Sequence, residues 1–329
     1  MGHMKSAFFN KAHDVLHERL LLSSFESITS FEDIVLRYKA PATCGELVQG
    51  AIDGQDFLVN CPIDLYAFAS LHKSIKPGVQ VREAERFGKL SQGIELLTAR
   101  QTQTRGPLPS QGLELLVASD VPRGKGMASS SADLAAALSI VADGLNMSLS
   151  ARELSTIIAQ IEPSDSVHLP GISHVNQLTG DVHACLPAPQ DLSVLVVDCG
   201  GELDTVNFDR EQAHEVYCRE QPKLRYALST LKAGLRDQDL KAVAHAATLS
   251  SKISQSILYK PQFEELLVRG CHAGALGVNC AHSGTVLGVL HRTSDGISES
   301  LSNLVERHFG STLQVLGCHQ VISGGCHAY

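Results

Sequence analysis

A stretch of small residues, VPRGKGMASSSAD, lies between an apolar run and an alanine-rich run, and its composition suits the binding of an anion. Glycine lets the backbone approach a ligand closely, and a helix start offers unpaired N–H groups and the positive end of the helix dipole. Serine hydroxyls add hydrogen bonds or an oxygen ligand for Mg²⁺. The stretch lacks the Gly-Lys-Ser/Thr order of a P-loop, so a phosphate site of another type is predicted.

An ordinary capped helix without a ligand is the alternative for the same stretch. Ser130 could act as the N-cap, with Asp133 three residues later as its capping-box partner. That role needs one serine, whereas this segment has three serines beside two glycines. This excess of serines and glycines over what a helix cap needs favours anion binding. Lys125, inside the loop, either offsets the charge of a phosphate or is a solvated side chain.

A second group of chemically useful residues is the sequence IEPSDS, in which Glu162 and Asp165 follow a predicted helix. A positioned carboxylate that accepts a proton contributes roughly 10²–10⁴-fold to the rate of proton transfer. Carboxylate oxygens are also suitable ligands for Mg²⁺. The alternative is a pair of solvated turn residues at the end of a helix.

The composition sets limits on the class of protein. The chain has 329 residues, of which 43% are hydrophobic and 19% charged, as in globular proteins that often contain two domains. A net charge of −8 argues against nucleic acid as the main partner. No membrane span or signal peptide is recognisable, and the nine cysteines contain no C-x-x-C pair. A cytoplasmic protein with reduced thiols is predicted.

The periodicity of apolar residues predicts the elements that position these groups. Residues 1–32 are expected to form a helical extension in which His13 and His17 have metal-ligand spacing but lack a third ligand, and residues 1–3 resemble a vector remnant. Four short strands are expected in IVLRYKA, GELVQGAI, DFLVNCPI and LYAFASLH, followed by a polar loop over 101–112 and the strand GLELLVASD.

Helices are then predicted up to Gly144 and over 149–161, the second with Ser150 as N-cap and Glu153 in a capping box. A domain boundary is placed at the proline-containing segment near residue 190, which gives domains 33–190 and 191–329. The second domain is expected to mix strands and helices: strands near 192–199, 275–291 and 313–322, and helices near 209–235, 238–257, 261–273 and 296–308.

Several motifs, taken together and in this order, resemble those of the GHMP kinases. PRGKGMASSSAD is similar to the family's phosphate-binding pattern P-x-x-x-G-L-G-S-S-A, with Met127 in place of leucine and Ala128 in place of the second glycine. APATCGELVQG (40–50) and GVNCAHSGTVLGVL (277–290) resemble the first and third family motifs. The variants PATCGELVQG, CPID, KGMASSSAD, IEPSDS and AHSG together resemble the PduX-type L-threonine kinases of cobalamin synthesis.

The resemblance implies an α+β fold of two domains, the first like domain 2 of ribosomal protein S5 and the second ferredoxin-like. It also implies ATP and Mg²⁺ as cofactors, with Ser130 and Glu162 as metal ligands. Asp165 is implied as the acceptor of the hydroxyl proton, with a role in positioning the hydroxyl as the alternative. A lysine that several family members carry corresponds here to Thr43, which leaves Lys125 as the substitute catalytic lysine. The implied nucleotide-binding residues are Pro122, Gly124, Lys125, Gly126, Met127, Ala128, Ser129, Ser130 and Ser131.

For the acceptor, the resemblance implies an amino acid, L-threonine, whose ammonium would need a carboxylate such as Glu46 or Asp64. The full implied set is Thr43, Cys44, Glu46, Asp64, Asn279, His282, Ser283 and Gly284. Homoserine, serine or a sugar stays open as the acceptor, as does a homodimeric assembly. A nucleotide-binding relative without turnover is the remaining alternative, although the presence of both Glu162 and Asp165 argues against it.

Overall fold

The structure is a computed structural model that describes residues 34–83, 88–108, 110–201 and 210–329. The predicted N-terminal helix, with His13 and His17, lies outside the described residues. In the described part, helices and strands alternate around one 11-stranded sheet whose main order is β10-β7-β9-β8-β1-β2-β4-β3. The α+β prediction is therefore confirmed.

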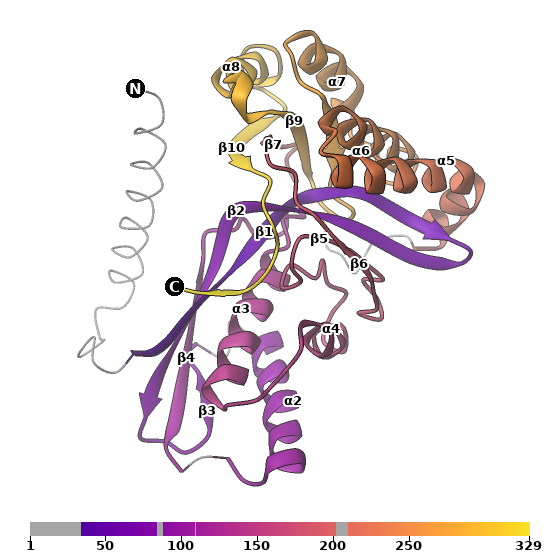
Figure 1. Ribbon diagram of the computed structural model, residues 1–329. Helices are drawn as coiled ribbons and strands as arrows, with labels where there is room; N and C mark the ends of the chain where they lie inside the picture. The colour runs from indigo at the N-terminus through magenta and orange to yellow at the C-terminus, as the bar shows by residue number, and fades with distance from the viewer. Residues whose placement is uncertain (1–33, 84–87, 109, 202–209) are drawn as a thin grey trace.

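A long β-hairpin runs through the middle of the molecule (Figure 1). Strands β1 (Ile34–Ile52) and β2 (Gln55–Ser74) pair antiparallel, and the turn residues Asp53 and Gly54 both have positive φ, as a tight hairpin turn requires. The four segments predicted as strands are all strand, but they join into two long strands, so the predicted number and length were wrong. Register shifts near Pro41 and between Thr43 and Val48 interrupt the ladder without ending it, since a bulge bends a strand while its neighbours stay paired.

Three helices cover one face of the N-terminal half. They are α2 (Gly88–Arg105), α3 (Ser129–Gly144) and α4 (Ala151–Ala159), and they share an apolar core with β1, β2, β3 (Val79–Val81) and β4 (Gly112–Ser119). Helix α4 begins with the predicted capping box between Ser150 and Glu153. The strand and helix on either side of the small-residue stretch are also confirmed.

Helix α2 was not predicted, and its last residues had been predicted as loop. Leu90, Ile94, Leu97 and Gln101 are its buried positions at helical spacing, so the signal was present. The glutamines and threonines at its exposed positions made the segment look like a polar loop, although the surface of a helix accepts such residues. The break comes only after Arg105, where Gly106 takes a positive φ.

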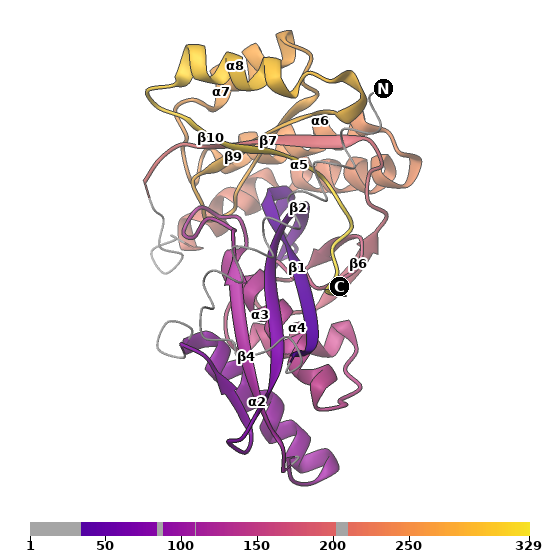
Figure 2. The same ribbon diagram turned by 90° about the vertical axis from the view of Figure 1, so that its left-hand side faces the viewer.

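The C-terminal half is a sheet between two pairs of helices (Figure 2). Its strands are β7 (Leu192–Asp198), β8 (Gly277–Cys280), β9 (Val286–Arg292) and β10 (Gln314–Gln320). Along β7, Val194 and Val196 join the core beneath α5 (Arg210–Asp237) and α6 (Leu240–Ser254). Leu195 and Val197 point the other way, toward α7 (Phe263–His272) and α8 (Ser298–Phe309). This two-residue alternation follows from strand geometry.

The elements predicted for this half are confirmed, with boundaries shifted by a few residues. The sheet is continuous between the halves because Glu46 of β1 pairs with Cys280 of β8. The C-terminal strand β11 (His327–Ala328) also returns to pair with β1. The predicted division near residue 190 stays a prediction.

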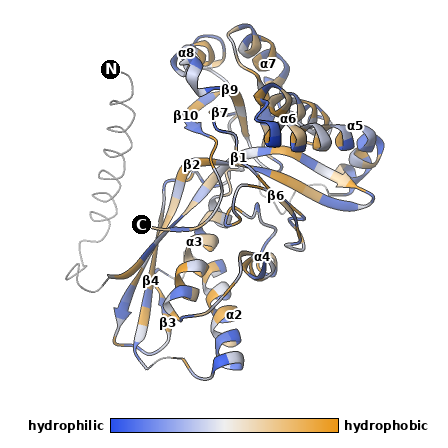
Figure 3. Cartoon of the chain, viewed as in Figure 1, coloured by the Kyte–Doolittle hydropathy of each residue, from blue (hydrophilic) through white to orange (hydrophobic). Residues whose placement is uncertain are grey.

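The hairpin strands carry apolar and polar segments along their length (Figure 3). Residues 40–51 of β1 and 57–63 of β2 are buried without alternation, as expected where both faces of a sheet are covered. A small antiparallel pair, β5 (Ile172–Val175) and β6 (Val182–Leu186), attaches to β2 and supports the loop that contains Glu162 and Asp165. Among the described helices, none combines the length and the apolar character that crossing a membrane requires.

Candidate active site

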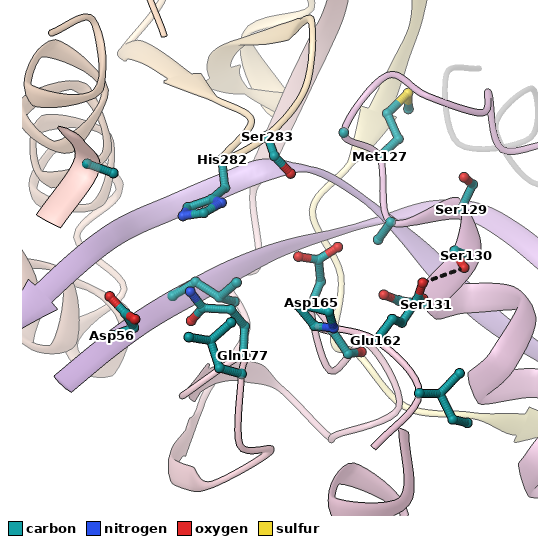
Figure 4. A pocket seen from close by; sticks show the side chains of 18 of the residues that line it. Asp56, Met127, Ser129, Ser130, Ser131, Glu162, Asp165, Gln177, His282 and Ser283 are labelled. Atoms are coloured by element: carbon teal, nitrogen blue, oxygen red, sulfur yellow. Dashed lines mark hydrogen bonds between the residues drawn. The ribbon is translucent and has the colours of Figure 1, made fainter. Parts of the chain in front are cut away.

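A cavity of about 1070 Å³ lies where the two halves meet, and most of the predicted site residues line it. The phosphate-loop candidates form one wall, the loop from Ile161 to Asp165 forms another, and α5 closes one end. Figure 4 shows His282 and Ser283 on the side opposite Asp165 and Glu162. The predicted residues that line the cavity are Gly124, Gly126, Met127, Ala128, Ser129, Ser130, Ser131, Glu162, Asp165, His282 and Ser283.

The small-residue stretch forms a loop that ends in the first turn of α3. Ala128 is the N-cap residue, with a left-handed φ of 58° and no side-chain capping bond. The alternative in which Ser130 caps this helix is therefore wrong. Its hydroxyl instead donates to Glu162 Oε2 at 2.9 Å, and Asp133 pairs with Arg123 at 2.8 Å. The N–H groups of the first turn lack intrahelical acceptors and so suit an anion.

The loop packs directly against the third motif at two glycines. Gly126 has a φ of 79°, and a Cβ there would lie 2.7 Å from Gly284 Cα. A Cβ on Gly284 would in turn lie 2.4 Å from both Gly126 Cα and the Lys125 carbonyl oxygen. The Thr285 N–H donates to that same carbonyl at 3.0 Å. Gly284 thus brings the two loops together instead of lining the cavity.

Lys125, the predicted catalytic lysine, does not line the cavity in the described structure. Its ammonium lies 2.8 Å from Asp198 Oδ2 and donates to the Gly201 carbonyl at 2.7 Å. Burial pushes the pKa of Asp198 up, but hydrogen bonds from Lys125, Thr285 and the Gly200 N–H outweigh it and hold that pKa below its usual value. Lys125 therefore joins the loop to the end of β7.

The two carboxylates of IEPSDS lie together in the cavity. Burial, and then the nearby charge of Glu162, raise the pKa of Asp165 to about 7. The Asn60 amide holds the Asp165 backbone by donating to its carbonyl oxygen at 2.9 Å. Such a carboxyl can change its protonation state near neutral pH, which suits general acid–base chemistry.

Glu162 and Ser130 supply the oxygen atoms that could hold a magnesium ion. Glu162 Oε1 is buried and has no hydrogen-bond partner among the described residues. In the same part of the chain there is no group of three or more His, Cys, Asp and Glu side chains suited to a metal. This donor set fits Mg²⁺, which usually takes one or two carboxylates and completes its shell with water and substrate phosphates.

The residues of the first motif lie behind the cavity wall. Glu46 is 4% exposed, and the His282 backbone N–H donates to its carboxylate. Burial, and then the charge of Asp165, raise the pKa of Glu46 well above its usual value, against opposing effects of the His282 N–H and of Lys260. Thr43 is also buried, and its N–H donates to the Met127 carbonyl at 3.1 Å.

The other predicted acceptor residues have structural contacts. The Asn279 amide donates to the carbonyl oxygens of Cys44 and Glu46, which fixes β8 against the bulged part of β1. Asp64 does not line the cavity. It accepts from the Gln320 N–H at 2.9 Å and lies 3.2 Å from His319 Nδ1, so it anchors the end of β10. Pro122 precedes the loop and is likewise outside the lining.

Several cavity residues carry no motif that sequence reasoning could have used. Lys89, at the start of α2, forms an ion pair with Glu162. Asp56 and Gln177 lie together at one end (Figure 4), and His214 and Tyr217 reach it from α5. Lys260 does not line the cavity, but it is a buried lysine that the sequence pattern did not indicate. It is 4% exposed, and its ammonium has no hydrogen-bond partner in the described part of the chain.

Comparisons with known proteins identify the family of the chain. The family model described as the GHMP kinases N terminal domain matches residues 92–172. An L-threonine kinase of Salmonella typhimurium is 32% identical over 279 residues, which cover 84% of this chain and 89% of the relative. An L-threonine kinase of Citrobacter freundii is 31% identical over 252 residues, or 77% of this chain and 85% of the relative.

Solved structures show the same fold. A homoserine kinase from Cytophaga hutchinsonii superposes with a TM-score of 0.71 at 19% identity, over 92% of this chain and 99% of its own. A galactokinase from Lactococcus lactis gives a TM-score of 0.68 at 11% identity, over 95% and 99%. The chain belongs to the GHMP kinases, in the branch that contains the L-threonine kinases, and is an ATP-dependent kinase that acts on an alcohol.

Proposed function

We propose that this kinase uses Mg²⁺ and ATP to phosphorylate the side-chain hydroxyl of L-threonine, and that the O-phospho-L-threonine serves cobalamin synthesis in the cytoplasm. One observation carries the proposal. The anion-binding helix start, the Ser130–Glu162 pair and Asp165 line a single cavity, which is large enough for a nucleotide beside a small acceptor. The identity to two L-threonine kinases favours threonine over other alcohols.

The nucleotide phosphates would lie along residues 124–131. The free N–H groups of the first turn of α3 and the positive end of its dipole would hold them there. Ser130 and Glu162 would hold the Mg²⁺ ion, which when bound neutralises charge on the transferring phosphoryl group.

Asp165 would accept the proton of the threonine hydroxyl. As the hydroxyl oxygen bonds to the γ-phosphorus, the bond from that phosphorus to the bridging oxygen of ADP breaks, and the proton passes to the Asp165 carboxylate. Because its pKa lies near 7, the carboxyl can take the proton and release it again at neutral pH. Asn60 and the β5–β6 pair keep it in place.

The ammonium group of the amino acid would interact with Glu46, which lies directly behind the cavity wall and accepts from the N–H of the lining residue His282. This buried carboxylate has one oxygen, Oε2, without a hydrogen-bond partner among the described residues, and it lies close enough to Asp165 for their charges to interact. A cation placed near both would relieve their repulsion. Asp64, the other predicted ammonium partner, is held by the end of β10, so Glu46 is the stronger candidate.

An acceptor screen tests the function. ADP release is measured with L-threonine, L-homoserine, L-serine and galactose, and the product is identified by ³¹P NMR. L-threonine should give the highest kcat/KM. A higher value with another acceptor would replace threonine as the substrate. Bound ATP without ADP release for any acceptor would instead establish a non-catalytic protein. Complementation of a strain that lacks its threonine kinase checks the link to cobalamin, and sedimentation analysis checks the predicted homodimer.

A further inference from the structure

The Lys89 side chain reaches into the cavity from a helix that the motifs do not include. Lys89 is the second residue of α2, and it lines the same cavity as the phosphate loop. Its ammonium forms an ion pair with Glu162 Oε2. The Lys89 side chain is 56% exposed, whereas that of Glu162 is 10% exposed. A mobile cation thus meets a fixed, nearly buried carboxylate.

The Glu162 carboxylate already has a cation, the Lys89 ammonium, at the position where a metal ion would bind. The oxygen that contacts Lys89, Oε2, also accepts the hydrogen bond from Ser130 Oγ. Ser130 and Glu162 are the two residues proposed to hold Mg²⁺. The positive charge of Lys89 therefore sits on the ligand pair that a metal ion would need.

A magnesium ion and the Lys89 ammonium cannot share this carboxylate at little cost. Both are cations, and at a few ångströms their repulsion is strong in a partly buried site. The ammonium is at the end of a flexible four-carbon side chain that is largely exposed. It can therefore move while the Glu162 carboxylate stays in place. The nucleotide phosphates, which would lie along the adjacent loop, offer it a new anionic partner.

We propose that Lys89 is an exchangeable partner of Glu162. In the nucleotide-free protein its ammonium occupies the cation position on Glu162, and when metal and nucleotide bind it moves to the phosphate groups. Lys89 is then both a placeholder for the metal and a nucleotide-binding residue. This inference rests on the proposed use of metal–ATP.

Binding measurements with two separate probes test the exchange. Mn²⁺ alone, without nucleotide, is titrated into the full chain and followed by EPR. ATP alone is titrated in the presence of EDTA and followed by calorimetry. Lys89→Met should bind Mn²⁺ about tenfold more tightly than the unaltered protein, because both the competing ion pair and the repulsion are lost. The same variant should bind metal-free ATP about tenfold more weakly, because a phosphate contact is lost.

Two further variants serve as controls. Lys89→Arg keeps the charge and should behave as the unaltered protein with both probes. Lys76→Met removes an exposed lysine far from the cavity and should change neither affinity. Thermal unfolding checks that Lys89→Met remains folded, as expected for an exposed residue in the first turn of a helix.

The outcomes separate the exchange from the function itself. Equal Mn²⁺ affinity in Lys89→Met and the unaltered protein overturns the exchange, as does unchanged ATP affinity. If the unaltered protein still turns over Mg–ATP in those cases, the proposed function survives. If it binds no Mn²⁺ even with ATP present and releases no ADP, both proposals fail.

Discussion

The Lys125 ammonium lies 2.8 Å from the Asp198 carboxylate and so joins the phosphate loop to the end of β7. The Asp198 side chain is 4% exposed. Lys125→Met would leave it without its cation, and we expect a loss of about 2 kcal/mol in the free energy of unfolding. Urea denaturation measures this loss.

The double variant Lys125→Met/Asp198→Asn distinguishes a structural role of Lys125, in the ion pair with Asp198, from a catalytic role. If the lysine acts through the pair, the double variant regains most of the lost stability and keeps kcat within a few-fold of the unaltered protein. A kcat that falls strongly in both variants would instead place Lys125 in the chemistry, as the sequence predicted.

Asp165→Asn should retain nucleotide binding and lose phosphoryl transfer by roughly 10²–10⁴-fold, the contribution typical of a positioned base. The pH profile adds a second test. Since the pKa of Asp165 is raised to about 7, the active carboxylate form becomes populated as pH rises through 7, and kcat/KM should rise with it. The residual activity of the variant should lack that limb. Turnover within a few-fold of the unaltered protein would remove Asp165 from the reaction.

The same carboxyl should make stability depend on pH. Its folded-state pKa of about 7 exceeds its ordinary value of 3.8, so the folded protein binds the proton more tightly than the unfolded chain. This stabilisation is complete below about pH 4 and is lost as pH rises through 7. Asp165→Asn should therefore be more stable than the unaltered protein at pH 8, with little difference at pH 4.

Urea denaturation at pH 4.5, 6 and 8 measures this trend. Asp237→Asn, at the exposed end of α5, removes a carboxylate without burial and serves as the control. A stability difference that stays constant across the three pH values would contradict the assignment. A variant that gains stability and loses activity shows the trade-off often seen when a catalytic group is removed.

Gly284→Ala should separate the phosphate loop from the third motif. Its Cβ would lie 2.4 Å from backbone atoms of Gly126 and Lys125, which cannot move aside as a side chain can. We expect a loss of about 1–3 kcal/mol in stability and about tenfold or more in ATP affinity. Gly88→Ala is the matched control, because nothing lies within 4 Å of a Cβ there. Equal ATP affinity in both variants would show that the loop contact is unimportant for nucleotide binding.

The parts of the site that the sequence predicted are those coded locally. A small-residue loop between a strand and a helix, and carboxylates that directly follow a helix, have chemical meaning from their neighbours alone. Ser130, Glu162 and Asp165 were singled out as candidates in this way, and the family resemblance then implied their roles. The structure brings all three into one cavity. The third motif entered through family resemblance, because its proximity to the loop depends on two glycines far apart in the chain.

The remaining features depend on contacts that local patterns do not contain. Lys125 has the right type and position for phosphate binding, but its direction is set by Asp198 on another strand. Asp64 has the right charge for an ammonium, but it accepts a hydrogen bond from Gln320 at the end of β10 instead. Lys89 reaches Glu162 only because α2 packs beside α3 and α4, and the polar surface of α2 concealed that helix.

The β1–β2 hairpin belongs to both halves of the enzyme. Its strands pair with β4 and β5 in one half and with β8 in the other, so the two halves share a backbone ladder. A fragment that ends near residue 190 would keep the hairpin but lose β8 and the helices packed on its upper part, leaving apolar surface and an unpaired strand edge exposed. The two halves are thus expected to be expressed, purified and unfolded only as one unit.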